Sequence, residues 1–441
     1  MSYFHLNLIL KGKLTVCCLL MLSVIPLNAQ REAKQIGDFK ESISLNEHLR
    51  GTKRTLQYCP DGDEFVCVNG KNRYTRALYG SHSPFRVETS DRPVFAFYNN
   101  GRGGNISFKV ILRDGTELAL DRTGYCESRY SAGKRTYYLT DPSWGKGELR
   151  ISVLALADMD GAIWRFSPSN MPKGAILRWQ HGGATGKRLS RNGDMGVDPA
   201  DCFELPAEAT DLVTGELALQ KEVYLVRGEV PEGYNVRKLY QQAEAASLAL
   251  ASHLKIETPD PYLNTLGGAL VAAADGIWDG QVWLHGAIGW RMPLSGWRAG
   301  YTGDALGWHD RARTHFDAYA ASQVTDVPNT IPHPAQDSTM NLARSEKRWG
   351  TPQYSNGYIC RNPERNNQMH HYDMNLCYMD ELLWHFNWTG DTAYVRKMWP
   401  MITRHLAWEK LNYDPDNDGL YDAYACIWAS DALYYLSLIH I

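Results

Sequence analysis

The sequence has no excess of charge of either sign. Its 441 residues include 46 Lys and Arg against 49 Asp and Glu, and the formal net charge is −3. A protein that binds nucleic acid through backbone phosphates needs a basic surface, and a strongly acidic chain creates the opposite field. Neither feature is present, so we expect no nucleic acid partner.

The sequence also lacks a metal-binding cysteine pattern. It holds nine cysteines, and no Cys-x-x-Cys or mixed Cys and His spacing connects them. Two of them, Cys17 and Cys18, fall in the leader described next, so an odd number remains and at least one has no partner within the chain. Cys59 and Cys67 are candidates for a disulfide, and a pair of free thiols is the alternative.

Only one long apolar run occurs, and it lies at the N-terminus. Lys11 and Lys13 precede the run Leu14–Leu27, which is followed by Asn-Ala-Gln. This order is typical of a secretory signal peptide, and the run is short for a membrane span. We predict a signal peptide over residues 1–29, a mature chain without a transmembrane segment, and export to the periplasm or beyond the cell.

Tryptophan and tyrosine, by contrast, are abundant. The chain has 14 Trp and 25 Tyr against 11 Phe. These side chains combine an apolar face with a polar handle, which suits stacking on a sugar ring as well as packing in a large core. The composition therefore permits a carbohydrate-binding cleft without requiring one.

Residues 30–233 predict an antiparallel β-sandwich. Short apolar or alternating runs recur between Gly-rich turns, and no helical pattern separates them, which disfavours a parallel sheet. The clearest runs are residues 93–99, 106–114, 117–122, 148–156, 162–168, 175–183 and 222–228.

The remaining chain predicts helices. Residues 234–257 are Ala-rich and Gly-free up to two prolines, which indicates a helix that links two domains. Residues 258–435 form the second domain, with a tight turn before Asp391 that favours a helical hairpin capped by Thr389 or Asp391. The expected helices are Asn264–Trp278, Gly303–Gln323, His370–Phe386 and Asp391–Leu411, with a fifth beginning near Ser430.

Several motifs in this second domain resemble one enzyme superfamily. They are Thr389-Gly390-Asp391, Trp399-Pro400, Trp408, the loop DPDNDGL at 414–420, and the Trp-, Arg- and Asp-rich segment 284–316. Together they resemble the six-hairpin glycosidases, in which a leading β-sandwich and linker helix often precede an (α/α)6 barrel. The details are most similar to a secreted Bacteroidetes branch associated with polysaccharide-degradation loci. The resemblance implies an (α/α)6 barrel after the sandwich and linker helix. Because residues 258–435 predict only four helices and the start of a fifth, we expect a β-sandwich, a linker helix and an incomplete (α/α)6 barrel.

The resemblance also implies glycoside hydrolysis, often with inversion, by two carboxylates on opposite sides of the anomeric carbon. The catalytic candidates are Asp304, Glu381, Asp310 and Asp431. Asp304 alternatively caps its helix. Because Asp380 and Glu381 are adjacent on one helix, only one of the two is expected to face the interior.

Further polar and aromatic residues are candidates for substrate binding. They are Trp290, Trp297, Arg298, Tyr301, Trp308, His309, His370, Asp416, Asp418, Asp422 and Trp428. Arg298 suits a bidentate clamp on sugar hydroxyls or a uronate, with a structural salt bridge as the alternative. His370 and His371 point to different helix faces, so we expect no shared metal there.

The loop that begins at Asp414 resembles the first half of a calcium-binding loop. Asp414, Asp416 and Asp418 occupy alternate positions before Gly419. Position 12 of that motif needs a bidentate Glu and holds Ala425 instead. We therefore expect a tight polar turn in which Gly419 takes a positive φ, and we treat Ca²⁺ as the lesser alternative.

The C-terminal end of the sequence is unusual. Residues 436–441, Leu-Ser-Leu-Ile-His-Ile, match the translation of a transposon-based sequencing adapter. We expect the natural gene to continue past Tyr435, with a genuine short apolar terminus as the alternative. Because the general base of many six-hairpin enzymes comes from a later hairpin, we expect little activity from the present chain.

Two other functions stay open at this point. Some polysaccharide lyases contain an α/α toroid and use Tyr, His and Arg chemistry, although they usually place the toroid before the β domain. A non-catalytic carbohydrate-binding protein would use the Trp-rich segment 278–308. The sequence predicts neither the sugar and its linkage nor an oligomeric state.

Overall fold

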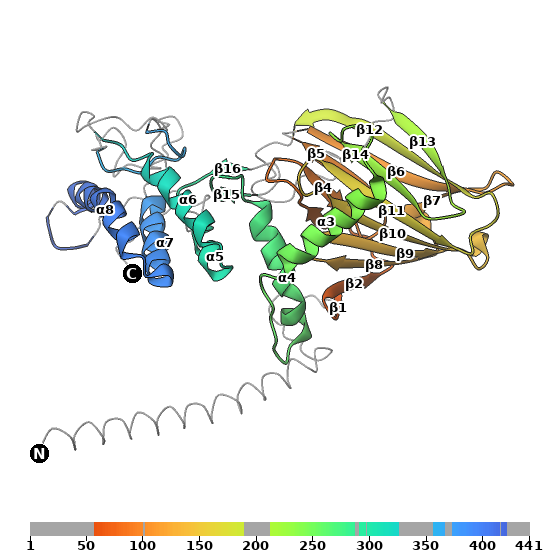
Figure 1. The fold of residues 1–441 in the computed structure, drawn as a ribbon, viewed down its shortest axis with the longest axis horizontal. Coiled ribbons are helices and arrows are strands. Elements are labelled where there is room, and N and C mark those ends of the chain that lie inside the picture. The colour runs from red at the N-terminus through yellow and green to blue at the C-terminus, as the bar shows by residue number, and fades with distance from the viewer. Residues whose placement is uncertain are drawn as a thin grey trace, which may run out of the picture.

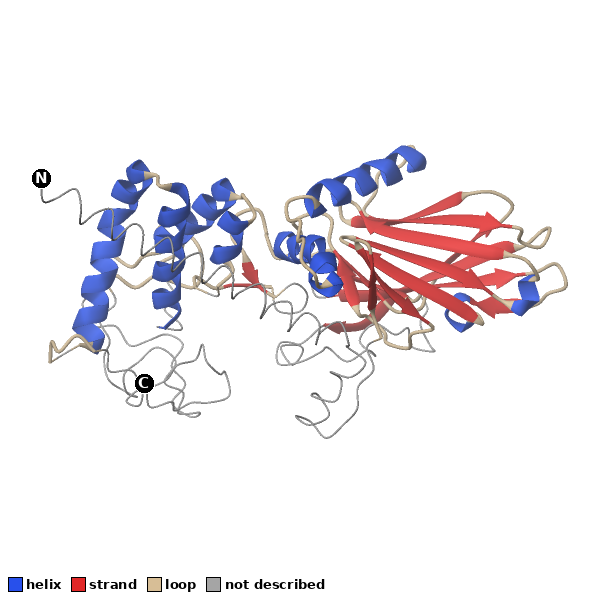
Figure 2. Cartoon of the chain, turned by 90° about the horizontal axis from the view of Figure 1, so that it is seen from below, coloured by secondary structure: helices blue, strands red, loops and turns tan. Residues whose placement is uncertain are grey.

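The computed structural model describes residues 57–99, 102–188, 212–286, 291–296, 298–325, 356–366, 373–414 and 416–420. In these residues two antiparallel β-sheets are followed by six α-helices, and Figures 1 and 2 show strands and helices gathered in two parts. The predicted signal peptide, the helix near Ser430 and the adapter-like residues 436–441 lie outside the described residues.

The first part is a sandwich of two seven-stranded sheets, and every strand pair within them is antiparallel. The first sheet has the order β1 (Cys59–Asp61), β2 (Glu64–Val68), β8 (Tyr125–Ser131), β9 (Lys134–Thr140), β10 (Glu148–Ala155), β11 (Gly161–Ser169) and β14 (Val223–Gly228). The second has the order β13 (Val213–Ala218), β12 (Ile176–Arg188), β6 (Arg102–Ile111), β5 (Phe95–Asn99), β4 (Arg86–Thr89) and β3 (Arg76–Leu78), and β7 (Glu117–Ala119) pairs with β6. The sheets of the predicted sandwich are confirmed.

The core of the sandwich follows from the period-two pattern of the strands. On β10, Leu149, Ile151 and Val153 are fully buried between the sheets, because alternate residues of a strand point to the same face. The Trp164 ring packs edge-on against Phe95 at 5.6 Å between centroids. Cys59 and Cys67 are free thiols, so no disulfide joins that pair.

Helix α3 (Val236–Ala251) packs on the sandwich as well as linking it to the helices (Figure 1). Its buried residues Leu239, Tyr240 and Ala243 lie against Leu154 and Ile163, which are outward-facing residues of β10 and β11. This amphipathic contact gives the helix a packing role that the predicted linker did not include.

The second part contains α4 (Pro261–Gly276), the two-residue strands β15 (Leu284–His285) and β16 (Met292–Pro293), α5 (Gly300–Ala305), α6 (His309–Ala320), α7 (Asp373–Thr389) and α8 (Thr392–Tyr413). No described helix is long and apolar enough to cross a membrane. Helices α6, α7 and α8 pack around Phe316, Tyr378 and Met398.

The prediction of one helix over Gly303–Gln323 is wrong, because the chain turns between α5 and α6. Gly307 has φ +74°, its N–H bonds to the Asp304 carbonyl at 3.0 Å, and the Trp308 N–H bonds to the Gly303 carbonyl at 2.7 Å. These two bonds form a Schellman motif, which ends a helix at a residue in the left-handed conformation.

The predicted hairpin of α7 and α8 is present. Gly390 has φ +61°, and Asp391 caps α8 by accepting hydrogen bonds from the N–H groups of Ala393 and Tyr394, both at 3.0 Å. Of the two candidates, Thr389 and Asp391, the N-cap of α8 is therefore Asp391. Large apolar side chains of this hairpin remain 43–56% exposed: Leu376, Leu383, Trp384, Trp388, Trp399, Leu406 and Leu411.

A polar junction joins the sandwich to the helices at the end of α4. Asp275 accepts hydrogen bonds from His82 at 3.2 Å and from Arg311 at 2.7 Å. The buried Arg86 donates to the Gly276 carbonyl at 2.5 Å. Burial alone would raise the pKa of Asp275, but the hydrogen bonds and charges of His82 and Arg311 lower it below its usual range.

Candidate functional site

A buried carboxyl group lies at the contact between α5 and α7. Glu381 is 1% exposed, and its carboxyl reaches the backbone at Gly300. A Cβ atom at Gly300 would lie 2.5 Å from Glu381 Oε2 and 3.3 Å from the Phe316 ring. Glycine at position 300 therefore makes room for the carboxyl group.

The environment of Glu381 favours its neutral form. Burial raises the pKa of Glu381 to about 8, the nearby N–H groups of Arg298 and Gly300 oppose the rise, and the charge of Asp380 adds to it. Neither carboxyl oxygen accepts a well-formed hydrogen bond from a described residue, so these N–H groups stabilise its charge only weakly. Near neutral pH Glu381 therefore carries a proton.

The neighbouring Asp380 faces away from the interior, as the sequence predicted for one of the two. It is exposed and accepts a short hydrogen bond from the Tyr301 hydroxyl. Burial, followed by the hydrogen bond and charge of Asp380, raises the pKa of Tyr301. The phenol of Tyr301 therefore keeps its proton.

One helical turn further along, Asp304 lies between two histidines. Its Oδ1 atom is 2.7 Å from His309 Nδ1 and 2.9 Å from His385 Nδ1, and its Oδ2 atom is also 2.9 Å from His385 Nδ1. Asp304 and His385 are buried, whereas the His309 side chain is 45% exposed. Asp304 does not cap a helix, since the N-cap of α5 is Ala299.

Arg298 lies at the edge of this contact. It is exposed, and its φ of +61° is in the left-handed region that a non-glycine residue seldom adopts. Strained backbone of this kind often occurs at functional sites. The structure brings Tyr301 and Asp304 of α5 against α7, which carries Glu381, and places Arg298 near Glu381 and His309 beside Asp304.

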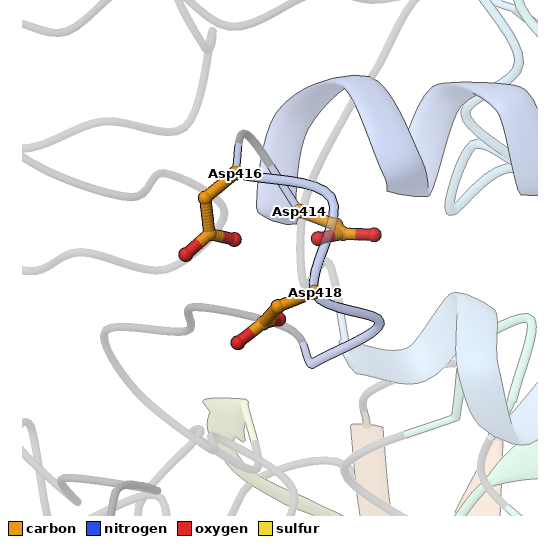
Figure 3. Close-up of side chains that lie close together, drawn as sticks. All are labelled: Asp414, Asp416 and Asp418. Carbon is orange, nitrogen blue, oxygen red and sulfur yellow. The ribbon is translucent and has the colours of Figure 1, made fainter.

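The Asp-rich loop forms a second polar group of side chains (Figure 3). One carboxylate oxygen from each of Asp414, Asp416 and Asp418 lies within 4.8 Å of the others. Asp414 Oδ1 also accepts the Gly419 N–H at 3.3 Å, and Gly419 has the predicted positive φ of +85°. Oxygen ligands suit Ca²⁺, but three carboxylates are fewer than the six to eight ligands that it takes.

The two groups of side chains lie at opposite ends of the hairpin. His385 is near the turn at Gly390, and the Asp414 loop follows the far end of α8. A helix the length of α8, which has 22 residues, spans about 33 Å. The acidic loop and the Asp304 group therefore do not share one sugar-sized site.

The other predicted site residues take varied positions. Asp310 is exposed in the first turn of α6, whereas Trp308 is buried between the His253 ring and the Arg311 guanidinium. The remaining ones lie outside the described residues: Trp290, Trp297, His370, Asp422, Trp428 and Asp431.

Two members of the site were missed as functional candidates. His385 repeats at helical spacing with Tyr378 and Leu382, which indicates that the three share a helix face. The pattern does not show that His385 contacts Asp304. No sequence pattern distinguishes Gly300, since its role depends on its distance to the side chain of Glu381, 81 positions away.

Comparisons with known proteins identify part of the chain. A family model described as a domain of unknown function (DUF4450) matches residues 100–230, which run from β6 to β14 of the sandwich. This is less than half of the chain, so the match concerns the sandwich. A search of curated proteins found no match.

The solved structures provide a distant likeness. Among 31 matching chains is a bacterial glucoamylase complexed with acarbose, at 8% sequence identity and a TM-score of 0.37. The match covers 58% of this chain and 53% of the glucoamylase, so the chain spans about half the length of that protein. No role of a site residue follows from this comparison.

Proposed function

We propose that this protein is an exported glycoside hydrolase in which Glu381 is the proton donor. The observation that supports this is a buried carboxyl group whose pKa is raised to about 8. A glycosidase needs one carboxylic acid that is still protonated at neutral pH, so that it can protonate the leaving oxygen. The TGD, WP and DxDxDG motifs of the six-hairpin resemblance support the same class of reaction.

The site also supports a hydrolase over a lyase. A lyase that used Tyr301 as its base would need a phenol that loses its proton readily, and the pKa of Tyr301 is raised by burial and by Asp380. Glu381 beside the exposed Arg298 and the half-buried Tyr301 instead matches a proton donor with polar residues around it.

A screen of the intact gene product against plant and host polysaccharides tests this proposal. Release of reducing ends is expected, and Glu381→Gln should lower the rate by about a hundredfold to ten-thousandfold. The matched control, Glu244→Gln, makes the same change on α3, where Glu244 pairs with Lys134 at 3.0 Å, and should retain most of the activity. Unsaturated uronate products would indicate a lyase, and tight binding without turnover would indicate a binding protein.

A further inference from the structure

The Asp304 carboxylate is an acceptor shared by two imidazole rings. Both His309 and His385 approach it with Nδ1, at 2.7 and 2.9 Å. Because an ionised carboxylate has no proton to give, each Nδ1 atom must donate the hydrogen bond. In a neutral ring the proton is then on Nδ1, and Nε2 keeps its lone pair.

The two rings differ in access to solvent. His385 is fully buried, with Phe316 and Tyr394 rings at 5.4 and 5.5 Å between centroids. His309 is the first residue of α6 and has a side chain that is 45% exposed. Of this pair, only His309 presents a basic nitrogen to the outside.

This arrangement lies next to Glu381. His385 follows Glu381 by four residues on α7, and Asp304 follows Gly300 by four residues on α5. A spacing of four residues is about 6 Å along a helix. The Gly300–Glu381 and Asp304–His385 contacts therefore occupy successive turns of one helix pair.

We propose that His309 is the general base that complements Glu381, and that Asp304 is the positioning residue that holds its ring. This inference rests on the proposed hydrolase function. Water gives a proton to His309 Nε2 while its oxygen bonds to the anomeric carbon. The glycosidic C–O bond breaks, and the leaving oxygen takes the proton of Glu381. The imidazolium then releases its proton to solvent, and Glu381 regains one.

The assignment differs from what the family resemblance implies. In that resemblance the base comes from a later hairpin, whereas here it lies at the start of α6. The same use of a buried carboxylate to fix a histidine tautomer occurs in serine hydrolases, where loss of the carboxylate leaves the ring in the wrong tautomer.

The tautomer can be measured without any substrate. In ¹⁵N NMR of histidine-labelled protein, neutral His309 should carry its proton on Nδ1, and Asp304→Asn should shift the proton to Nε2. His309→Gln assigns the signal. A wild-type ring protonated on Nε2 would overturn the role of Asp304.

Activity then tests the role of His309 itself. His309→Gln should lower kcat by about a hundredfold to ten-thousandfold with KM nearly unchanged, and added imidazole should partly restore His309→Ala. His253→Gln is the control, since His253 is a nearby exposed histidine whose Nδ1 atom faces the Leu306 carbonyl. If the wild type hydrolyses glycosides and His309→Gln matches it, the base lies elsewhere and only this inference fails. An intact gene product without hydrolase activity overturns both proposals.

Discussion

At the scale of single residues, Glu381 connects chemistry with stability. Burial keeps the Glu381 carboxyl group protonated in the folded protein, so it can donate a proton. The same burial means that ionisation of Glu381 destabilises the fold. In the unfolded chain this residue ionises near pH 4.5, the ordinary pKa of glutamate, while in the folded chain it stays protonated up to about pH 8.

This difference predicts how stability depends on pH. Glu381 does not weaken the fold below pH 4.5, progressively destabilises it as the pH rises to about 8, and has a constant effect above that. The loss attributable to this one group is on the order of 5 kcal/mol at most, at 1.36 kcal/mol for each pKa unit. Urea unfolding from pH 4.5 to pH 9 should show this fall, and Glu381→Gln should flatten it. An unchanged profile in the variant would contradict the raised pKa.

Gly300 is the second residue on which the site depends. Gly300→Ala should destabilise the protein by about 1–3 kcal/mol, because its methyl group would overlap Glu381 Oε2. The cost should be smaller when Glu381→Ala is also present, and a double-mutant cycle by urea unfolding measures the difference. Additive effects would mean that the two residues do not compete for this space.

At the scale of elements, the sequence predicted the strands, which have a repeating apolar pattern, but missed the position at which α5 ends. Alternating apolar residues such as Leu149, Ile151 and Val153 were enough to predict strands, because one face of each strand must be buried. The end of α5 was missed, because Gly307 follows a helical pattern that resumes at His309 and only backbone geometry separates the two helices. Burial of one of the pair Asp380 and Glu381 was foreseen, but which one was buried depended on packing.

The cap of α8 gives a prediction at this scale. Asp391→Ala removes a side chain that accepts two N–H groups and lies 3.0 Å from Arg313, so it should lower the unfolding free energy by about 1 kcal/mol. Asp310→Ala is a matched control, since Asp310 is also acidic and in a first turn but α6 has no side-chain cap. Its cost should be a few tenths of a kcal/mol. Equal losses in the two variants would argue against the cap.

At the scale of the whole molecule, polar contacts join the sandwich to the helices in addition to the apolar contact of α3. Asp275 from α4, with His82 from the sandwich and Arg311 from α6, connects three segments that are distant in sequence. No sequence motif predicted a role for these residues, because their hydrogen bonds join parts of the chain that meet only in the folded protein.

This junction should make the two parts unfold together. Asp275→Ala removes charged hydrogen bonds at a buried position and should cost about 2–3 kcal/mol, with calorimetry showing two separate transitions in place of one. Lys397→Ala is the control, because it removes an exposed ion pair with Asp317 within the helical part and should leave a single transition. A single transition in Asp275→Ala would show that other contacts couple the two parts.

Whether Glu381 holds a proton at neutral pH can be measured by a ¹³C NMR titration of glutamate carboxyl groups. Comparison of the wild type with Glu381→Gln assigns the resonance. We expect a midpoint near pH 8 for this carboxyl group. A midpoint near pH 4.5, the ordinary value for glutamate, would rule out Glu381 as the proton donor, since its side chain would then be ionised at neutral pH.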